Sequence, residues 1–77
     1  MSIRVQIRLY ASLRGLEPPS ASNHPLPSGT TVGEALAGLK VPGDQVKLVF
    51  VNGRKVDLQR VLEDGDRLGV FPPVGGG

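Results

Sequence analysis

The amino-acid sequence predicts one α+β domain, in which a single main helix packs across a mixed sheet of four to five strands. Three observations lead to this prediction: an alternating apolar pattern near the N-terminus, one amphipathic segment with helical spacing, and an Asn-Gly turn between two apolar runs. The chain has 77 residues, which suffices for one thin core. We therefore expect no deep enclosed pocket beside the scaffold.

The first strand is expected over residues 3–10. Apolar residues there alternate with polar ones and one tyrosine, in the order Ile3, Arg4, Val5, Gln6, Ile7, Arg8, Leu9 and Tyr10. A period of two is typical of a strand with one buried face. A short helical turn is expected to follow over residues 11–15.

The next segment is rich in proline. Residues 17–23 are expected to form a mobile loop, because Pro18 and Pro19 interrupt regular structure. Residues 24–27 can form at most a short edge strand, since Pro25 and Pro27 have no N–H to donate to a neighbouring strand.

One helix is expected to begin after Thr31. Its hydroxyl can cap the first turn, and Glu34 stands three residues later, as in a capping box. The apolar residues that follow have the spacing i, i+3, i+4 and i+7 and form one stripe; they are Val32, Ala35, Leu36 and Leu39. Pro42 and Gly43 mark the end of the helix.

A hairpin and a last strand complete the predicted sheet. Asn52-Gly53 suits a type I′ turn, which sets Phe50 opposite Lys55 and turns both away from the core. The side chains of three valines then point toward the core; they are Val49, Val51 and Val56. A short helical turn is expected after residue 57, then a tight turn at 64–66, then a strand over 67–71 whose Phe71 points outward.

The expected order of elements is strand, strand, helix, strand, strand, strand. The two terminal strands have the strongest patterns, and such long-range pairs often lie at the centre of a sheet. One helix packed across a mixed sheet in this order is a β-grasp arrangement. We predict a domain over residues 1–71 and a flexible C-terminal tail over residues 72–77.

The side chains offer little catalytic chemistry. The chain has no cysteine, and its one histidine, His24, lies in the proline-rich segment. Asp64 and Asp66 flank Gly65, which is typical of a turn rather than of a metal site. No phosphate-binding glycine loop is present. We therefore expect a protein that is not an enzyme by itself, binds no metal and holds no cofactor.

Composition also excludes several partners. The formal net charge is only +2, and the basic residues near the N-terminus form no dense stripe, so a nucleic-acid partner is not expected. No apolar run approaches the roughly 20 residues of a membrane span, and the alternating N-terminus is no signal peptide. The absence of cysteine suits a reducing compartment, so we expect a cytoplasmic protein with no membrane partner.

The remaining chemistry lies in the ending "GVFPPVGGG", which finishes on Gly77. A terminal glycine leaves the carboxyl carbon unhindered, and Gly75 and Gly76 can enter a channel where any Cβ would clash. Pro72 and Pro73 stiffen the base of the tail. These residues predict a delivery arm of about 20 Å with a stiff root and a slender reactive tip. Glycine-rich termini are also commonly disordered without any function.

Several motifs in order along the chain resemble the ubiquitin-like sulfur-carrier proteins of the MoaD/ThiS type. They are "LYASLRGL" in the first strand, "TTVGEAL" at the helix, "FVNGRKV" in the hairpin and "EDGDRLGVFPPVGGG" at the end. The resemblance covers nearly the whole chain outside residues 17–29. The segment "FPPVGGG" looks most like the small subunit of molybdopterin synthase.

This resemblance implies a mechanism. An E1-like activating enzyme of the MoeB/ThiF type would use ATP and magnesium to adenylate the carboxylate of Gly77. Sulfur transfer would then give a thiocarboxylate, with Gly75 and Gly76 threading the partner's channel. In molybdopterin synthesis, the loaded tail would enter a large synthase subunit of the MoaE type and donate sulfur to precursor Z.

The resemblance also implies a docking face on the outer side of the sheet. Tyr10, Phe50, Lys55 and Phe71 are expected on that side, and Pro72, Pro73 and Val74 continue it into the tail. The family often has an apolar residue where this chain has Lys55. For Tyr10 and Phe71 the alternative is ordinary partial burial.

Three alternatives to a molybdopterin sulfur carrier remain open. They are a sulfur carrier for thiamine, cysteine or tungsten-cofactor synthesis, a protein modifier ligated through Gly77, and a plain interaction domain.

Overall fold

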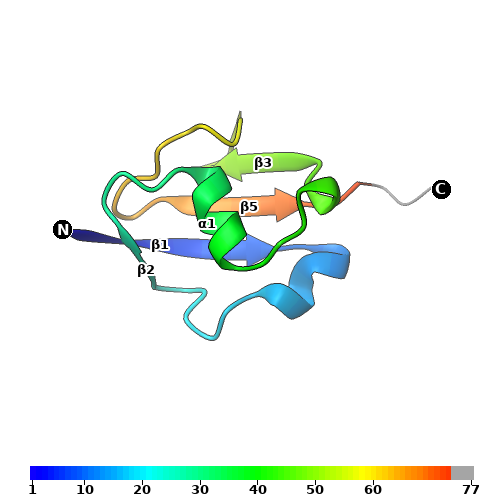
Figure 1. Cartoon of the computed structure of the whole chain (residues 1–77), viewed down its shortest axis with the longest axis horizontal. Helices are drawn as coiled ribbons and strands as arrows, with labels where there is room; N and C mark the ends of the chain where they lie inside the picture. Colours follow the sequence, from blue (N-terminus) through cyan, green and yellow to red (C-terminus); the bar gives the residue numbers. More distant parts are fainter. Residues whose placement is uncertain (74–77) are drawn as a thin grey trace.

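The computed structural model describes residues 1–73 of the chain. It contains one five-stranded sheet with the strand order β2-β1-β5-β3-β4. Helix α1 (Val32–Gly38) crosses one face of this sheet, as Figure 1 shows. The strands are β1 (Ser2–Leu9), β2 (His24–Pro27), β3 (Leu48–Val51), β4 (Arg54–Val56) and β5 (Arg67–Phe71). Two short 3-10 helices, η1 (Ala11–Leu16) and η2 (Gly43–Gln45), lie in the connections. The α+β, β-grasp prediction is confirmed.

The first and last strands pair in the interior of the sheet. β1 and β5 run parallel, with Ile7 beside Leu68 and Leu9 beside Val70. The other three neighbouring pairs are antiparallel. Since β1 and β5 come from opposite ends of the chain, they bring the two ends of the sequence side by side in one layer (Figure 1). The short strands β2 and β4 are left at the edges of the sheet.

The core lies between the sheet and helix α1. Residues of β1 alternate between exposed and buried along its whole length, as its sequence predicts. Burying each large aliphatic side chain contributes about 1.5–3 kcal/mol. The largest fully buried side chains are Val5, Ile7, Leu9, Val32, Val51, Leu62, Leu68 and Val70.

Helix α1 begins with the predicted capping box. The Thr31 hydroxyl accepts a hydrogen bond from the Glu34 N–H at 3.1 Å, and Glu34 Oε1 accepts one from the Thr31 N–H at 2.9 Å. The helix ends at Gly38, slightly before the predicted stop at Pro42. Lys40 there has a φ of 62°, and the Val41 N–H returns to the Leu36 carbonyl at 3.0 Å. This left-handed residue closes the helix in place of the proline.

The segment after β4 corrects one prediction, because residues 57–60 form a single turn rather than a short helical one. The Arg60 N–H bonds the Asp57 carbonyl at 3.3 Å, and the chain then passes beside the start of helix α1. The carbonyls of Leu58 and Arg60 accept the N–H groups of Gly33 and Val32 at 2.8 and 2.9 Å. N–H groups in the first turn of a helix have no acceptor within that helix. The segment after β4 can supply its carbonyls as acceptors because it does not use them in a helix of its own.

Candidate functional site

Three aromatic rings meet on the face of the sheet that α1 leaves open. The rings of Tyr10 and Phe71 are stacked, with centroids 4.3 Å apart and an interplanar angle of 5°. Phe50 meets Phe71 edge-on, at 5.7 Å and 87°. We call Tyr10, Phe50 and Phe71 the aromatic cluster. All three residues were predicted to point outward, and the structure brings them into contact.

Strand register explains why these residues meet. The Tyr10 N–H bonds the Val70 carbonyl at 3.1 Å, which extends the β1–β5 pairing by one residue and sets Tyr10 beside Phe71. Ala11 follows with a φ of 52°, so the chain turns away directly after Tyr10. On the other side of β5, Phe50 lies opposite Gly69.

Gly69 keeps this part of the face open. It lies between Arg8 on β1 and Phe50 on β3, and it has no side chain to fill the space between them. A Cβ placed there would lie 3.5 Å from Cε2 of Tyr10. The result is an open depression of about 550 Å³, lined by Gln6, Arg8, Tyr10, Phe50, Gly53, Arg67, Leu68, Gly69 and Phe71.

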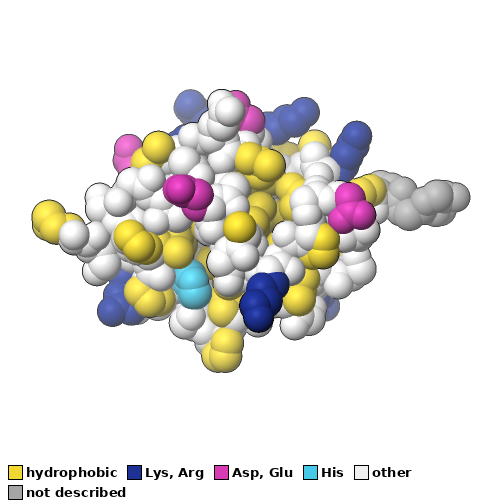
Figure 2. Space-filling view, viewed as in Figure 1, with side chains coloured by type: hydrophobic (Ala, Val, Ile, Leu, Met, Phe, Trp, Pro, Cys, Tyr) yellow, Lys and Arg dark blue, Asp and Glu magenta, His cyan; other side chains and the backbone are white. Residues whose placement is uncertain are grey.

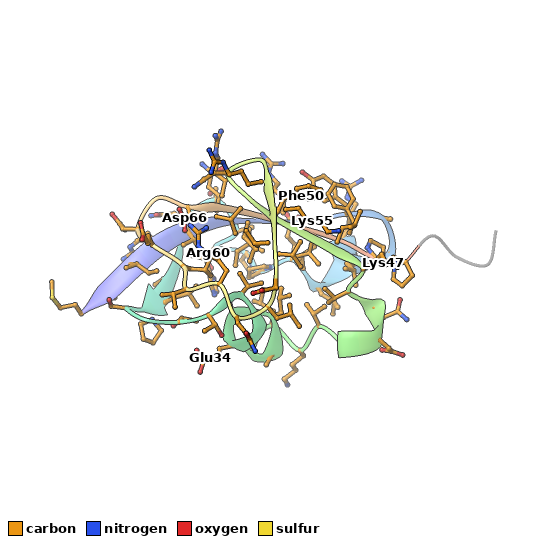
Figure 3. The ribbon with its side chains drawn as sticks, turned by 90° about the horizontal axis from the view of Figure 1, so that it is seen from above. Glu34, Lys47, Phe50, Lys55, Arg60 and Asp66 are labelled. Carbon is orange, nitrogen blue, oxygen red and sulfur yellow. The ribbon has the colours of Figure 1, made fainter. Side chains whose placement is uncertain are left out.

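Lys55 occupies its predicted place. It pairs with Phe50 across the β3–β4 hairpin, in the register that the Asn52-Gly53 turn predicts. Asn52 and Gly53 both have positive φ, at 54° and 82°. Figure 3 shows Phe50 and Lys55 on the side of the sheet away from Glu34 of helix α1. A cation therefore borders the aromatic cluster.

Sequence reasoning did not identify Arg8, Arg67 or Gly69 as part of this site. A signal was available for each of them. Arg8 shares the alternation of Tyr10, while Arg67 and Gly69 share the alternation of Phe71, so all belong to one face by the period-two rule. Only the pairing of β1 with β5 places these two series side by side.

The tail begins at the edge of the aromatic cluster. The Phe71 carbonyl accepts a hydrogen bond from the Lys47 N–H at 2.9 Å, which holds the last residue of β5 against the start of β3. Pro72 is half-buried and Pro73 is exposed. The predictions for Val74, Gly75, Gly76 and Gly77 concern residues outside the described part of the chain.

The aspartates of the tight turn serve the fold. Asp64 Oδ1 accepts the Arg4 N–H at 2.8 Å. Asp66 is buried; its Oδ1 accepts from the Asn52 amide at 2.9 Å and its Oδ2 from the Glu63 N–H at 2.8 Å. Figure 3 shows Arg60 beside Asp66, and their closest N–O distance is 3.6 Å.

The rest of the described chain offers no comparable site. His24 Nδ1 lies 2.7 Å from the Ser20 hydroxyl, without a further polar group to complete a catalytic set. Within residues 1–73 no cluster of three or more acidic or histidine side chains is arranged to hold a metal. On the helix-bearing face, hydrophobic side chains form small separate patches among polar and charged ones (Figure 2). None of the helices in the described range is long and apolar enough to cross a membrane.

Comparison with solved structures shows the same fold in archaeal proteins. HVO 2177 of Haloferax volcanii is 27% identical, with a TM-score of 0.78 over 99% of this chain and 88% of that one. Small archaeal modifier protein 1 of the same organism is 26% identical, with a TM-score of 0.70 over 94% and 99%. A putative molybdopterin converting factor subunit 1 of Pyrococcus furiosus is 28% identical, with a TM-score of 0.66 over 94% and 99%.

Comparison with curated protein sequences finds no match. The sequence model of the ThiS family, in contrast, matches residues 7–77 and so covers all but the first six residues. The matched range contains the aromatic cluster, every residue that lines the depression except Gln6, and the glycine ending. The resemblance to ubiquitin-like sulfur carriers of the MoaD/ThiS type is thereby confirmed, and this chain belongs to the ThiS family.

Proposed function

We propose that this protein is a sulfur carrier that is loaded on the carboxylate of Gly77 and delivers sulfur as the small subunit of a molybdopterin synthase. The observation that carries the proposal is the ThiS-family match, which runs through the glycine ending. The aromatic cluster supports it, because a partner that covers Tyr10 and Phe71 is held where the tail leaves the sheet. Aromatic side chains in that position suit a binding hot spot.

The loading chemistry needs a partner enzyme. A Gly77 carboxylate oxygen attacks the α-phosphorus of ATP, and pyrophosphate leaves to give an acyl-adenylate. Hydrosulfide from a sulfur donor then attacks the carbonyl carbon; AMP leaves, and a thiocarboxylate and a proton remain. An E1-like activating enzyme of the MoeB/ThiF type would bind the ATP and magnesium. This chain supplies the acyl group and a docking face, and within residues 1–73 no cluster of three or more acidic or histidine side chains is arranged to hold the magnesium.

The choice of molybdopterin as the destination rests on two observations. The ending Phe71-Pro72-Pro73-Val74 resembles the small subunits of molybdopterin synthase. The Pyrococcus furiosus protein of the same fold is described as subunit 1 of a converting factor, a name that implies at least one further subunit. We propose a large subunit of the MoaE type as the partner that accepts the loaded tail and holds precursor Z.

A second candidate function has its own support. The Haloferax volcanii protein of the same fold is named a small archaeal modifier protein. A modifier would use the same acyl-adenylate but would pass Gly77 to a lysine amine. Sulfur supply for thiamine is the third destination, and the ThiS-family match favours it as much as it favours molybdopterin.

The first experiment tests loading. The protein is incubated with an E1-like activating enzyme, MgATP and sulfide, and its intact mass is measured. Replacement of one carboxylate oxygen by sulfur raises the mass by about 16 Da. A variant without Gly76 and Gly77 is the control and should keep its mass. An unchanged mass for the full chain, with an enzyme that loads its own carrier, would contradict the proposal.

The second experiment separates the destinations. The loaded protein is mixed with a MoaE-type large subunit and precursor Z, and molybdopterin is measured by its fluorescent oxidation product. A thiazole-forming assay and a blot for heavier conjugates in cells run in parallel. Molybdopterin formation that disappears in the variant without Gly76 and Gly77 is the expected result. Conjugates or thiazole without molybdopterin would assign the protein to the second or third function.

A further inference from the structure

The sheet face with the aromatic cluster carries charge of one sign. Outward-facing strand positions alternate with the buried ones, so the burial pattern and the strand register identify them. Four of these positions hold cations, and within residues 1–73 none holds an acid. The four cations are Arg4, Arg8, Lys55 and Arg67. The chain as a whole has nearly balanced charge, with nine Lys or Arg and seven Asp or Glu, so this face is locally basic.

Most acidic side chains are engaged by the main chain of this protein, and Asp64 is bound to the main chain of Arg4 itself. Five of the seven carboxylates accept hydrogen bonds from main-chain N–H groups of this chain; they are Glu17, Glu34, Asp57, Asp64 and Asp66. The one ion pair in the described range joins Arg60 to buried Asp66. Neither residue of this pair holds an outward position on the basic face. Of the four cations, Arg4 donates through Nη1 to the Asn23 carbonyl at 3.4 Å, whereas Arg8, Lys55 and Arg67 are exposed and lie where a partner's acidic groups can reach them.

Gly69 lies between two arginines on one side and two aromatic residues on the other. Arg8 lies opposite Gly69 on β1, and Arg67 precedes Gly69 by two residues on β5. Phe50 lies opposite Gly69 on β3, and Phe71 follows it by two residues. All of these residues line the same depression of about 550 Å³. A partner that fits this depression has a negative group to meet the arginines and, beside it, a large apolar group to contact the aromatic residues.

We propose that the E1-like activating enzyme covers this face with a carboxylate side chain seated over Gly69, between Arg8 and Arg67, and with an apolar residue on the aromatic cluster. The inference rests on the proposed function, and it applies to all three sulfur or modifier pathways because each begins with such an enzyme. Guanidinium groups match carboxylates in charge and in geometry. The two halves of the depression thus select a partner surface that is both acidic and apolar.

A nucleic acid fits this face less well. Single strands bind proteins by stacking their bases on open aromatic faces. Here Tyr10 and Phe71 are stacked on each other, at 4.3 Å and 5°, and Phe50 meets Phe71 with its edge. The rings therefore already cover part of one another's surface. What the cluster offers is one continuous apolar patch, which suits a protein side chain better than a series of bases.

The test compares two double variants with equal loss of charge. Arg8→Ala with Arg67→Ala removes both arginines that border Gly69. Lys40→Ala with Arg54→Ala removes two exposed cations, one just after helix α1 and one at an inward-alternating position of edge strand β4. Binding to the activating enzyme is measured by calorimetry at low and at raised NaCl, and far-UV circular dichroism with thermal melting confirms that both variants fold.

We expect the Arg8/Arg67 variant to bind the enzyme about tenfold or more weakly, and the Lys40/Arg54 variant to stay within about twofold of wild type. Added salt should weaken wild-type binding and should affect the Arg8/Arg67 variant less. Equal Kd values for the two variants would overturn the inference. A wild-type Kd that is the same at low and at raised NaCl would also overturn it. So would Arg8/Arg67-dependent binding of a fluorescein-labelled single-stranded 20-mer, if enzyme binding were unchanged.

Failure of this inference can be told apart from failure of the proposed function. If wild type gains the thiocarboxylate mass while the Arg8/Arg67 variant binds as the control does, only the inference is wrong. If wild type neither binds the enzyme nor gains mass, the proposed function is wrong and the inference falls with it.

Discussion

The ring of Tyr10 lies parallel to the ring of Phe71, at a centroid distance of 4.3 Å and an angle of 5°. Tyr10 directly follows the first strand, and Phe71 is the last residue of the last one. Their contact depends on the parallel pairing of β1 with β5. It marks the place where the proposed carrier tail leaves the sheet, so the pairing of β1 with β5 sets the position of the docking face that we propose beside the start of the tail.

Truncation of this stack should impair docking more than folding. Tyr10 is 41% exposed and Phe71 is 36% exposed, so either change to alanine should lower the free energy of unfolding by only about 1 kcal/mol. Loss of a central aromatic contact should weaken binding to the activating enzyme about tenfold or more. Urea denaturation and the rate of thiocarboxylate formation at limiting carrier measure the two effects.

Leu16→Ala is the matched control for these variants, since Leu16 is 37% exposed and lies in η1 rather than on the sheet. It should show a similar small loss of stability and a normal loading rate. Loading that is as fast for Tyr10→Ala as for Leu16→Ala would exclude the aromatic cluster from docking.

Asn52 should matter for stability beyond its turn geometry. Its amide donates to buried Asp66 Oδ1 at 2.9 Å, and its oxygen accepts the Arg67 N–H at 3.0 Å. Asn52→Gly keeps the positive φ at no steric cost but removes both bonds, and should cost about 1–2 kcal/mol. Asn52→Ala adds backbone strain at a φ of 54° and should cost more. Equal urea midpoints for Asn52→Gly and wild type would show that these bonds contribute nothing.

The capping box should behave as one unit. Thr31→Ala removes the acceptor for the Glu34 N–H, and Glu34→Ala removes the acceptor for the Thr31 N–H. Each change should cost about 0.5–2 kcal/mol. In a double-mutant cycle, the two losses should not add, because the pair fixes the same helix start. Strict additivity in chemical denaturation would mean that each bond acts alone.

Two glycines of helix α1 should respond in opposite directions to alanine. At Gly38 a Cβ would meet no other atom within 4 Å, so Gly38→Ala should stabilise by about 0.5–1 kcal/mol through helix propensity. At Gly33 a Cβ would lie 3.2 Å from the Leu58 carbonyl oxygen, which the Gly33 N–H holds at 2.8 Å. Gly33→Ala should therefore gain nothing or lose stability. A higher melting temperature for Gly33→Ala than for Gly38→Ala would contradict this interpretation of the contact.

Much of the fold follows from short stretches of sequence. The alternation from Ile3 to Leu9 identified both a strand and its buried face. Thr31 and Glu34 identified the start of the helix, and Asn52-Gly53 predicted the register of the hairpin. Each of these features depends on contacts between residues that are near neighbours in the chain, so the local pattern contains the information needed.

The site was predictable only in part. Period-two alternation places Tyr10, Phe50 and Phe71 outward, but it does not say that their rings touch. It also does not reveal that Gly69 leaves a depression with Arg8 and Arg67 on one side. The turn after residue 57 was missed for a related reason. The carbonyl of Leu58 accepts a hydrogen bond from the N–H of Gly33, and a local pattern does not reveal a partner so far away in the sequence.

The sequence by itself determined most elements of this protein, their buried faces and a glycine ending that lies within the range of the ThiS-family match. The tertiary structure alone decided which outward side chains share one face, through the parallel pairing of β1 with β5 and the antiparallel pairing of β5 with β3. The physical reason is that local propensity acts over a few residues, whereas the basic and aromatic surface around Gly69 exists only when three strands from separate parts of the chain lie side by side.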